Sequence, residues 1–421
     1  MAGSLSRTTA PFAVHSFRLQ WPADLMTSLA FEMETLILGW YILTTTGSVF
    51  WLTVFAAMQF HGTLVSPLLG VIGDRIGHRN LLCCMRAVYV GLAATLLTLA
   101  ASGLLGPVAV VVVASLMGIV RPSDLSVRAA SVAQSIPADL LVGALGISRT
   151  TSDVARIAGA LTGAGVLAKL GMAPAYMIIT AIYAGGLVLL LLARTKDGAI
   201  IASGTRAERG ISGAWRDLKE GMAYVRSTPR LLAAVWLAFL MNMTTLPLSG
   251  GLLPFVAKGV YGTDQTGLGY LSASFAAGAF IGSFGLSLAA RWIRLARAMM
   301  LSGIIWCVVL MVFATTTTLR EGVVLLLLAG VMQSVCLVSM AILLLKTSEE
   351  RLRGRVMGVR MLAIISQVPG LLPAGLLIER FGFSATAQLY SGGALLCTIL
   401  IWGMWHKDLW PPEAVANVRT T

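Results

Sequence analysis

Ionisable side chains inside apolar stretches are the residues of this sequence best placed to do chemistry, and the first stretch carries three carboxyls. On a helix, steps of four, four, three and four place on one face Asp24, Ser28, Glu32, Thr35 and Gly39. Glu34 lies about 200° away from Glu32 around the same helix. A carboxyl in hydrocarbon favours its neutral form, and it can gain or lose a proton when its neighbours change. We therefore expect Glu32 to face a cavity and couple to protons, with Glu34 as a second candidate and Asp24 as a substrate contact. The alternative is that these acids are structural groups, hydrogen-bonded between helices.

Two later stretches each place an acid between two bases. In the first, the positions i, i+3 and i+7 are Arg121, Asp124 and Arg128. In the second, the positions i, i+4 and i+7 are Arg149, Asp153 and Arg156. Either set can line one helix face. Asp124 and Asp153 are therefore further candidates for proton coupling. Structural ion pairing between neighbouring helices is the alternative.

Other polar side chains interrupt apolar stretches singly. His61 lies near the middle of the second stretch, and its imidazole titrates near neutral pH, so it is also a proton-coupling candidate. The other explanation is a neutral histidine that packs against backbone. Three uncharged groups are candidates for the substrate cavity, or for hydrogen bonds between helices: Asn242, Gln333 and Gln367.

The elements that carry these residues are membrane-length helices. With 57% hydrophobic residues, 12% charged residues and a mean hydropathy of +0.84, the 421-residue chain is too apolar for a water-soluble protein. About 20 apolar residues span the hydrocarbon core as a helix. Twelve such stretches are predicted, at 17–43, 48–72, 81–101, 107–128, 145–168, 174–193, 231–257, 265–289, 298–317, 321–345, 356–378 and 384–405. The first is too long and too acidic for a cleavable signal.

The net charge of +13 could indicate a nucleic-acid partner, but the placement of the bases gives another explanation. If both termini are cytoplasmic, most of the 31 Lys and Arg residues lie near the inner face. Near the outer face lie only Lys169, Lys258, Arg320 and Arg380. We therefore expect a multi-pass protein of the plasma membrane, the inner membrane in a Gram-negative cell. Its basic face would contact anionic lipid and no nucleic acid.

The sequence contains no motif for metal binding, ATP binding or hydrolysis. The five cysteines lie in apolar stretches without ligand spacing, so we expect packing roles, no metal and no cofactor. No Gly-x-x-x-x-Gly-Lys-Ser/Thr occurs, so ATP is not the expected energy source. No cluster has hydrolase spacing, which makes a membrane enzyme the least expected class and leaves no catalytic residue to assign.

The chain divides into two related halves. A basic stretch at 194–230, which includes a possible amphipathic surface helix, separates a six-helix bundle at 1–193 from another at 231–421. A constant offset of 211 pairs Gly143 with Gly354, Arg149 with Arg360, Gly159 with Gly370 and Gly171 with Gly382. Internal repeats of this kind predict a site between the halves near the midplane of the membrane.

Gly70 to Arg79 (GVIGDRIGHR) form a glycine-rich, charged turn between the second and third stretches. The turn resembles the loop of the major facilitator superfamily whose pattern is Gly-x-Leu-Ala-Asp-Arg-x-Gly-Arg-Lys-x-x-Leu. The residues in register are Gly70, Asp74, Arg75, Gly77, Arg79 and Leu82. The resemblance implies an all-α fold of twelve helices in two pseudo-symmetric bundles, with both termini cytoplasmic.

Two longer segments resemble the enterobactin-exporter-like, drug-proton antiporter branch of that superfamily. They are IPADLLVGALGISRTTSDVARIAGALTGAG around the fifth helix and RLRGRVMGVRMLAIISQVPG around the eleventh. Arg156 matches the arginine before the antiporter signature, in which Ala160 stands where proline is usual. The resemblance implies a conformational gate made by Gly70, Asp74, Arg75, Gly77, Arg79, Arg121, Arg156 and Gly354. In that gate Asp74 would accept hydrogen bonds at the start of the eleventh helix.

The functional expectation is a monomeric secondary transporter. It would export an amphipathic small molecule, such as a siderophore or drug, by alternating access in exchange for protons. An uptake symporter or a lipid translocator could use the same fold, because fold does not fix direction or substrate. A receptor that keeps the fold but moves nothing is the competitor from another class.

Overall fold

The computed structural model describes residues 10–193, 210–289 and 293–410, and within these ranges every regular element is a helix. Nine of the described helical segments are long and apolar enough to cross a membrane. A further apolar helix, Val49–Leu64, is shorter. The chain is therefore an all-helical, multi-pass membrane protein by length and composition.

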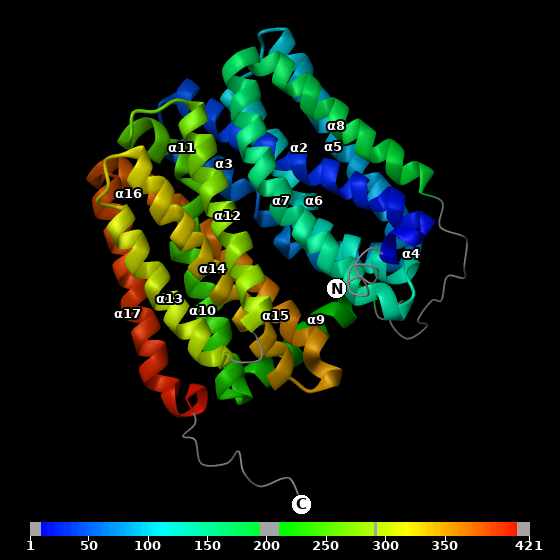
Figure 1. Cartoon of the computed structure of the whole chain (residues 1–421), viewed down its shortest axis with the longest axis vertical. Helices are drawn as coiled ribbons and strands as arrows, with labels where there is room; N and C mark the ends of the chain where they lie inside the picture. Colours follow the sequence, from blue (N-terminus) through cyan, green and yellow to red (C-terminus); the bar gives the residue numbers. More distant parts are fainter. Residues whose placement is uncertain (1–9, 194–209, 290–292, 411–421) are drawn as a thin grey trace, which may run out of the picture.

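We call the helices before the linker the N half (Figure 1). It begins with the 3-10 turn η1 (Ala10–Ala13) and contains α2 (His15–Thr46), α3 (Val49–Met58), η2 (His61–Leu64), α4 (Ser66–Ile76), α5 (His78–Ala101), α6 (Pro107–Ser135), α7 (Ala138–Leu170) and α8 (Met172–Leu192). At 32 and 33 residues, α2 and α7 are long enough to span a bilayer, although both carry several charges.

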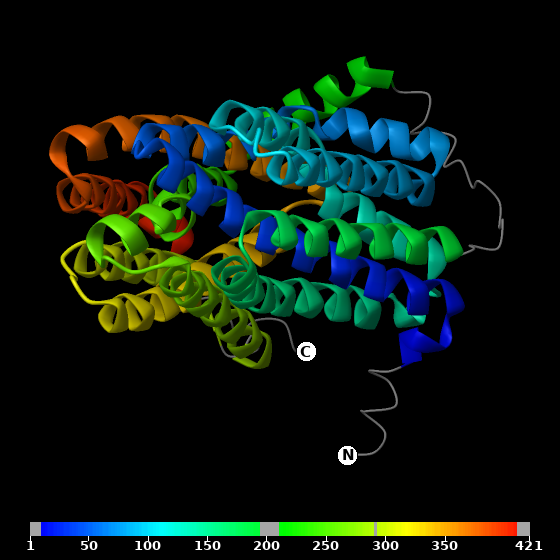
Figure 2. The same ribbon diagram turned by 90° about the horizontal axis from the view of Figure 1, so that it is seen from above.

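The C half follows the linker. It contains α10 (Pro229–Leu246), η4 (Pro247–Gly251), α11 (Leu253–Phe255), η5 (Val256–Val260), α12 (Gln265–Ala289), α13 (Leu295–Phe313), α14 (Leu319–Thr347), η6 (Glu350–Leu352), α15 (Arg353–Leu362), η7 (Ala363–Ser366), α16 (Gln367–Phe381) and α17 (Phe383–Leu409). In Figure 2 the two halves lie side by side.

Three predicted stretches are interrupted helices. The stretch at 48–72 divides into α3, the 3-10 turn η2 and α4, and the eleventh stretch divides in the same way around η7. The seventh contains the π-helical segments η4 and η5. At the first break, Gly62 lies against the backbone of Gly118 on α6, where a Cβ atom would have no room. Glycine therefore lets the second and fourth passes approach backbone to backbone.

The linker helix α9 (Gly210–Ser227) forms where the sequence predicts a short amphipathic helix. It lies at the edge of the molecule, outside both bundles (Figure 2). Arg355 of α15 holds it through Asp217, 2.8 Å away, and through Glu220. We call the side that carries α9, the start of α2 and the end of α17 the linker side, and the opposite one the far side (Figure 1).

The halves pack on each other toward the far side. Gly269 of α12 lies against Ala160 and Ala164 of α7, and Gly375 of α16 lies against Phe50 and Thr53 of α3. In Figure 1 the two bundles meet at this end and diverge toward the linker side. Packing between the halves thus closes one end of the space between them.

Candidate transport cavity

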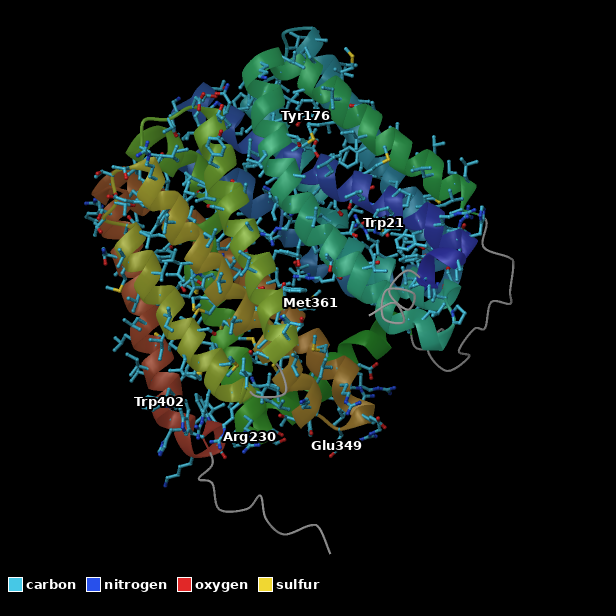
Figure 3. All side chains as sticks on the ribbon, viewed as in Figure 1. Trp21, Tyr176, Arg230, Glu349, Met361 and Trp402 are labelled. Carbon is cyan, nitrogen blue, oxygen red and sulfur yellow. The ribbon has the colours of Figure 1, made fainter. Side chains whose placement is uncertain are left out.

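A cavity of about 520 Å³ lies between the two halves. It is lined by the segments from α2 to α7 of the N half and by those from α10 to α12 and from α15 to α16 of the C half. Met361 of α15, labelled in Figure 3, is one of the lining residues and lies where the bundles diverge. The repeat predicts a site between the halves, and this is where the cavity lies.

The two walls of the cavity differ in chemistry. Every charged residue among the described lining residues comes from the N half: Glu32, Arg121, Asp124, Arg128, Arg149, Asp153 and Arg156. The C half contributes a largely apolar wall that includes Leu253, Phe275 and Leu371, with Ser249 and Gln367 among its few polar groups. Such a cavity can hold a molecule with a polar end and an apolar end.

Asp124 and Arg128 of the charged wall belong to a four-residue ion-pair cluster that extends behind it to Asp24 and Arg86. Arg86 of α5 is fully buried and donates to Asp24 at 2.9 Å and to Asp124 at 3.0 Å. Arg128 lies 2.5 Å from Asp124 and 3.5 Å from Asp24. The charges of the two bases and two acids balance. Because these residues come from α2, α5 and α6, their ion pairs hold the three helices together. Asp24 belongs to it and is not a lining residue of the cavity.

A second set of pairs is looser. Arg149 lies 3.7 Å from Asp153 on α7, and its side chain is 61% exposed. Arg156 lies 3.9 Å from Glu32 of α2, and both side chains are partly exposed. Ser28, Thr35 and Gly39 line the cavity beside Glu32, so four of the five residues predicted to share a face do so.

Arg121 differs from the other bases of the wall. Its guanidinium donates to the amide oxygen of Gln59 and, at 3.2 Å, to the hydroxyl of Thr35, and it lies over the ring of Phe31. Arg121 forms no ion pair with any carboxylate in the described part of the chain. It is therefore a cavity base whose contacts are all with neutral groups.

Glu34 is buried and does not line this cavity, but it lies beside it, in a small pocket that Gln59 and Arg121 also line. Tyr183 donates to one of its carboxylate oxygens at 2.9 Å, and Tyr176 to the other at 3.4 Å. Figure 3 shows Tyr176 within the N half, on α8. Two phenol donors can hold a carboxylate inside a helix bundle.

The remaining candidates are placed as follows. Gln367 lines the cavity and donates to Asn242 at 3.1 Å, so Asn242 reaches the cavity only through it. His61 starts η2 and its Nδ1 lies 2.7 Å from the carbonyl oxygen of Met58. Gln333 is buried on α14 and does not line the cavity.

The predicted gate residues other than Arg121 and Arg156, which line the cavity, belong to the segment from α4 to the start of α5 and to α15, on the linker side. Gly77 joins α4 to α5 at a φ of 88°, a backbone conformation that favours glycine. Arg79 donates to the carbonyl oxygens of Leu190 and Leu191 at the end of α8, within its own half. Gly70 lies in α4, Arg75 is exposed near the end of α4 and Gly354 is exposed in the first turn of α15. The side chain of Asp74 lies outside the described part of the structure.

At the far side a carboxylate joins the two halves. Glu379, near the end of α16, accepts from the Ser48 hydroxyl at 2.6 Å and from the Phe50 amide at 3.0 Å. Ser48 caps the N-terminus of α3. The donors are thus free groups at a helix start, which favour an anion.

Some of these groups were missed by the sequence analysis. Arg86 lies inside the predicted stretch 81–101, where the rule that singled out the other buried charges applies to it equally. Glu379 follows the predicted stretch 356–378 by one residue, so it was not considered as a buried or paired charge. Gln59, Tyr176 and Tyr183 give no sequence signal that separates them from packing residues.

Comparison with known proteins identifies the family. The sequence profile described as Major Facilitator Superfamily matches residues 21–364. The chain belongs to the Major Facilitator Superfamily. No curated protein matches the chain in sequence.

Solved structures of this superfamily's transporters have the same fold. A POT family transporter in complex with 5-aminolevulinic acid aligns with a TM-score of 0.72 at 11% identity, over 94% of this chain and 96% of that one. A mutant of the nucleoside transporter NupG gives 0.70 at 12% identity, over 93% and 100%. A D-xylose-proton symporter gives 0.65 at 10% identity, over 94% and 97%. The family and these neighbours identify a membrane transporter rather than an enzyme.

Proposed function

We propose that this protein is a proton-coupled exporter of amphipathic small molecules. The observation that carries the proposal is the cavity between the halves, which has a charged wall on one side and an apolar wall on the other. A molecule with a polar and an apolar part can contact both walls at once. Its departure requires the halves to separate at one end and to close at the other, which is alternating access.

The proposed membrane arrangement has twelve spans. Besides the nine segments that meet the length and apolarity criteria, α2, α7 and the interrupted pass from α3 to α4 would cross the bilayer. Their polar groups face the cavity or the inside of the N half, where charge is tolerated in a membrane protein. With the basic residues at the inner face, the linker side and both termini would be cytoplasmic, and the protein would be a monomer of the plasma membrane.

An exporter takes up its substrate from the cytoplasm while its outer end is closed. Packing and the Glu379 contacts join the halves at the far side, which this orientation places outside the cell. The cavity would then take up its substrate from the cytoplasm. The opposite, outward-open state would be stabilised by the cytoplasmic gate, in which Asp74 of α4 accepts hydrogen bonds at the start of α15. The other proposed gate residues on this side are Gly70, Arg75, Gly77, Arg79 and Gly354.

Proton coupling is assigned to Glu32. It is the lining carboxyl with the longest ion-pair distance, 3.9 Å, and its partner Arg156 lies on a different helix. Protonation would release Arg156, and proton loss would restore the pair. Asp124 and Asp153 have closer partners, whereas Glu34 and His61 do not line the cavity.

The test is net flux by the purified protein in proteoliposomes under an imposed pH gradient. A thermal-shift screen with a catecholate siderophore, ethidium and lysophosphatidylcholine would choose the probe. We expect probe movement against the direction of proton flow. Movement with the protons would indicate an uptake symporter, probe exchange between leaflets a lipid translocator, and binding without flux a receptor.

A further inference from the structure

The charge balance of the cavity wall indicates which substrates it suits. Asp24 and Asp124 are neutralised by Arg86 and Arg128 in the buried cluster. Asp153 has Arg149 as its partner. Glu32 faces Arg156. Arg121 is then the lining arginine that forms no ion pair in the described part of the chain, although Glu32 and Glu34 lie within its electrostatic range. Of these two acids, Glu32 has Arg156 as its partner, and Glu34 does not line the cavity and accepts from Tyr176 and Tyr183.

Arg121 is also held in place for a ligand. Gln59, which directly follows α3, and Thr35 from α2 accept two of its hydrogen bonds, and Phe31 lies against the plane of its guanidinium. A guanidinium has five N–H donors in a fixed fork. Gln59 and Thr35 accept through one nitrogen, Nη1, so donors remain on the rest of the group for a ligand in the cavity.

The open end of the cavity is basic as well. Arg149, which lines the cavity, is exposed there and lies within electrostatic range of Arg360 on α15 of the other half. Arg360 donates to the carbonyl oxygen of Leu337 and forms no ion pair in the described part of the chain. The two arginines occupy equivalent positions in the repeat, 211 residues apart. Bases around a low-dielectric entrance raise the local concentration of anions.

We propose, on the basis of the function above, that the substrate is an amphipathic organic anion whose acidic group binds Arg121. A carboxylate, sulfonate or phosphate can accept a forked pair of hydrogen bonds from a guanidinium, which an ammonium group cannot provide with equal geometry. The apolar part of the molecule contacts the C-half wall at Leu253, Phe275 and Leu371. The cation site that three carboxylates on the wall could have formed is absent, because each carboxylate has an arginine partner.

The experiment compares three probes with one ring system: 2-naphthylacetate, 2-naphthylacetamide and 2-(2-naphthyl)ethylamine. Thermal shift and quenching titrations are measured on the whole purified protein. We expect the anion to bind more tightly than the neutral and cationic probes. Arg121→Gln should weaken anion binding by about tenfold or more and leave the amide unchanged, because it removes a charged hydrogen bond. Arg121→Lys should recover part of the affinity.

Arg351→Gln is the matched control, because Arg351 is exposed on the linker side, outside the cavity. It should leave all three affinities unchanged. Equal binding of the three probes, preference for the amine, or no binding of the anion would overturn the charge assignment. Flux of any probe by the wild-type protein is measured in parallel. Transport of a cation would leave the proposed exporter intact and refute only its anion specificity.

At the far side, hydrogen bonds to Glu379 join the two halves and carry a second, independent inference. Hydrogen bonds from the Ser48 hydroxyl and the Phe50 amide of the N half end on Glu379 Oε1 of the C half. One donor, the Phe50 amide, lies in the first turn of α3, and the other, Ser48, is its cap. Glu379 stands near the end of α16, and α3 and α16 pack along each other there.

We infer that Glu379 is a latch that stabilises the state closed at the far side. The contact cannot persist when the halves separate at that end, so it contributes only to the closed state. An anion at a helix N-terminus with an additional hydroxyl donor favours closure. The arrangement is the counterpart of the one expected on the linker side, where an acid near the end of α4 would meet the start of α15.

The latch is tested by labelling. In a protein that lacks the five native cysteines, Ser272→Cys places a reporter on the cavity wall, at a partly exposed position of α12. A membrane-impermeant maleimide is applied to the outer face of oriented vesicles. Glu379→Ala should raise the labelling rate about threefold to tenfold, and Glu379→Gln should raise it less, since the amide oxygen still accepts hydrogen bonds.

Glu321→Ala is the control, because Glu321 is an exposed acid in the first turn of α14, at the same side but within one half. It should leave the rate unchanged. Unchanged labelling in Glu379→Ala, with normal folding shown by gel filtration, would refute the latch. An equal rise in both variants would attribute the effect to surface charge and refute it as well.

Discussion

Arg156 Nε lies 3.9 Å from Glu32 Oε1 across the contact of α7 with α2, beyond hydrogen-bond distance. The side chains are 34% and 27% exposed, whereas the Asp24 and Arg86 pair behind them is buried and closes to 2.9 Å. A loose, partly solvated pair can be broken by a proton at small cost, because little desolvation is involved. The same wall thus contains one rigid cluster and one pair that can respond to protons.

Glu32→Gln should abolish flux driven by a pH gradient while binding of a neutral probe persists. The amide imitates the protonated acid and cannot titrate. Flux and binding are measured with the same proteoliposome preparation. Glu34→Gln is the comparison and should reduce flux less, because Glu34 does not line the cavity and the one amide oxygen of Gln can still accept from Tyr183. If Glu32→Gln retains wild-type proton coupling, Glu32 is not the coupling residue, and Asp124, Asp153 and His61 become the candidates.

Asp74→Asn should shift the population toward the state open on the linker side. In the proposed gate the carboxylate accepts from free amides at the start of α15, an interaction that typically favours an anion by ~0.3 to 1 kcal/mol. The measurement is the accessibility of a cavity cysteine from the cytoplasmic side. If accessibility and transport both stay at the wild-type level, the loop sets topology only.

Arg86→Met should destabilise the protein by about 3 to 5 kcal/mol, because Asp24 and Asp124 would lose a fully buried partner. The unfolding free energy in detergent is the quantity to compare. Adding Asp24→Asn to the same chain should restore part of the loss, because the cluster then has one acid, Asp124, and one base, Arg128. Arg351→Met, at a mostly exposed pair, should cost at most about 1 kcal/mol. Similar losses for the two single variants would contradict a structural cluster.

Gly118→Ala should cost about 1 to 3 kcal/mol, since the added methyl would meet the carbonyl oxygen of Met58 where α6 crosses the second pass. Gly91→Ala on α5 has open space around the new methyl, so it should be neutral or stabilise by up to about 1 kcal/mol. Thermal unfolding of both variants checks the difference. A stable Gly118→Ala variant would show that the two passes can move apart.

Much of the fold could be predicted because lipid imposes long apolar stretches. The positions of α5, α8, α12 and α14 follow from hydropathy, and the linker helix follows from its amphipathic pattern. The interruptions at η2 and η7 could not be located in this way. They depend on contacts between passes, such as Gly62 on Gly118, which hydropathy does not encode.

The polar face of α2 shows both the strength and the limit of helical periodicity. The spacing placed Ser28, Glu32 and Thr35 together, and all three line the cavity. It also placed Asp24 on that face, but Arg86 and Arg128 from neighbouring helices hold Asp24 in the buried cluster. Periodicity orders the residues of one helix, whereas the partners from other helices decide which of them reaches the cavity.

The most direct test of proton-coupled export is net transport across the membrane of proteoliposomes that contain the purified protein. The vesicles are loaded with the probe that gives the largest thermal stabilisation, and a pH gradient of either sign is imposed. We expect the probe to move opposite to the proton flow and to reverse its direction when the gradient is reversed. Glu32→Gln should abolish both effects. Probe movement that is the same with and without a gradient, in wild type and variant alike, would contradict proton-coupled export.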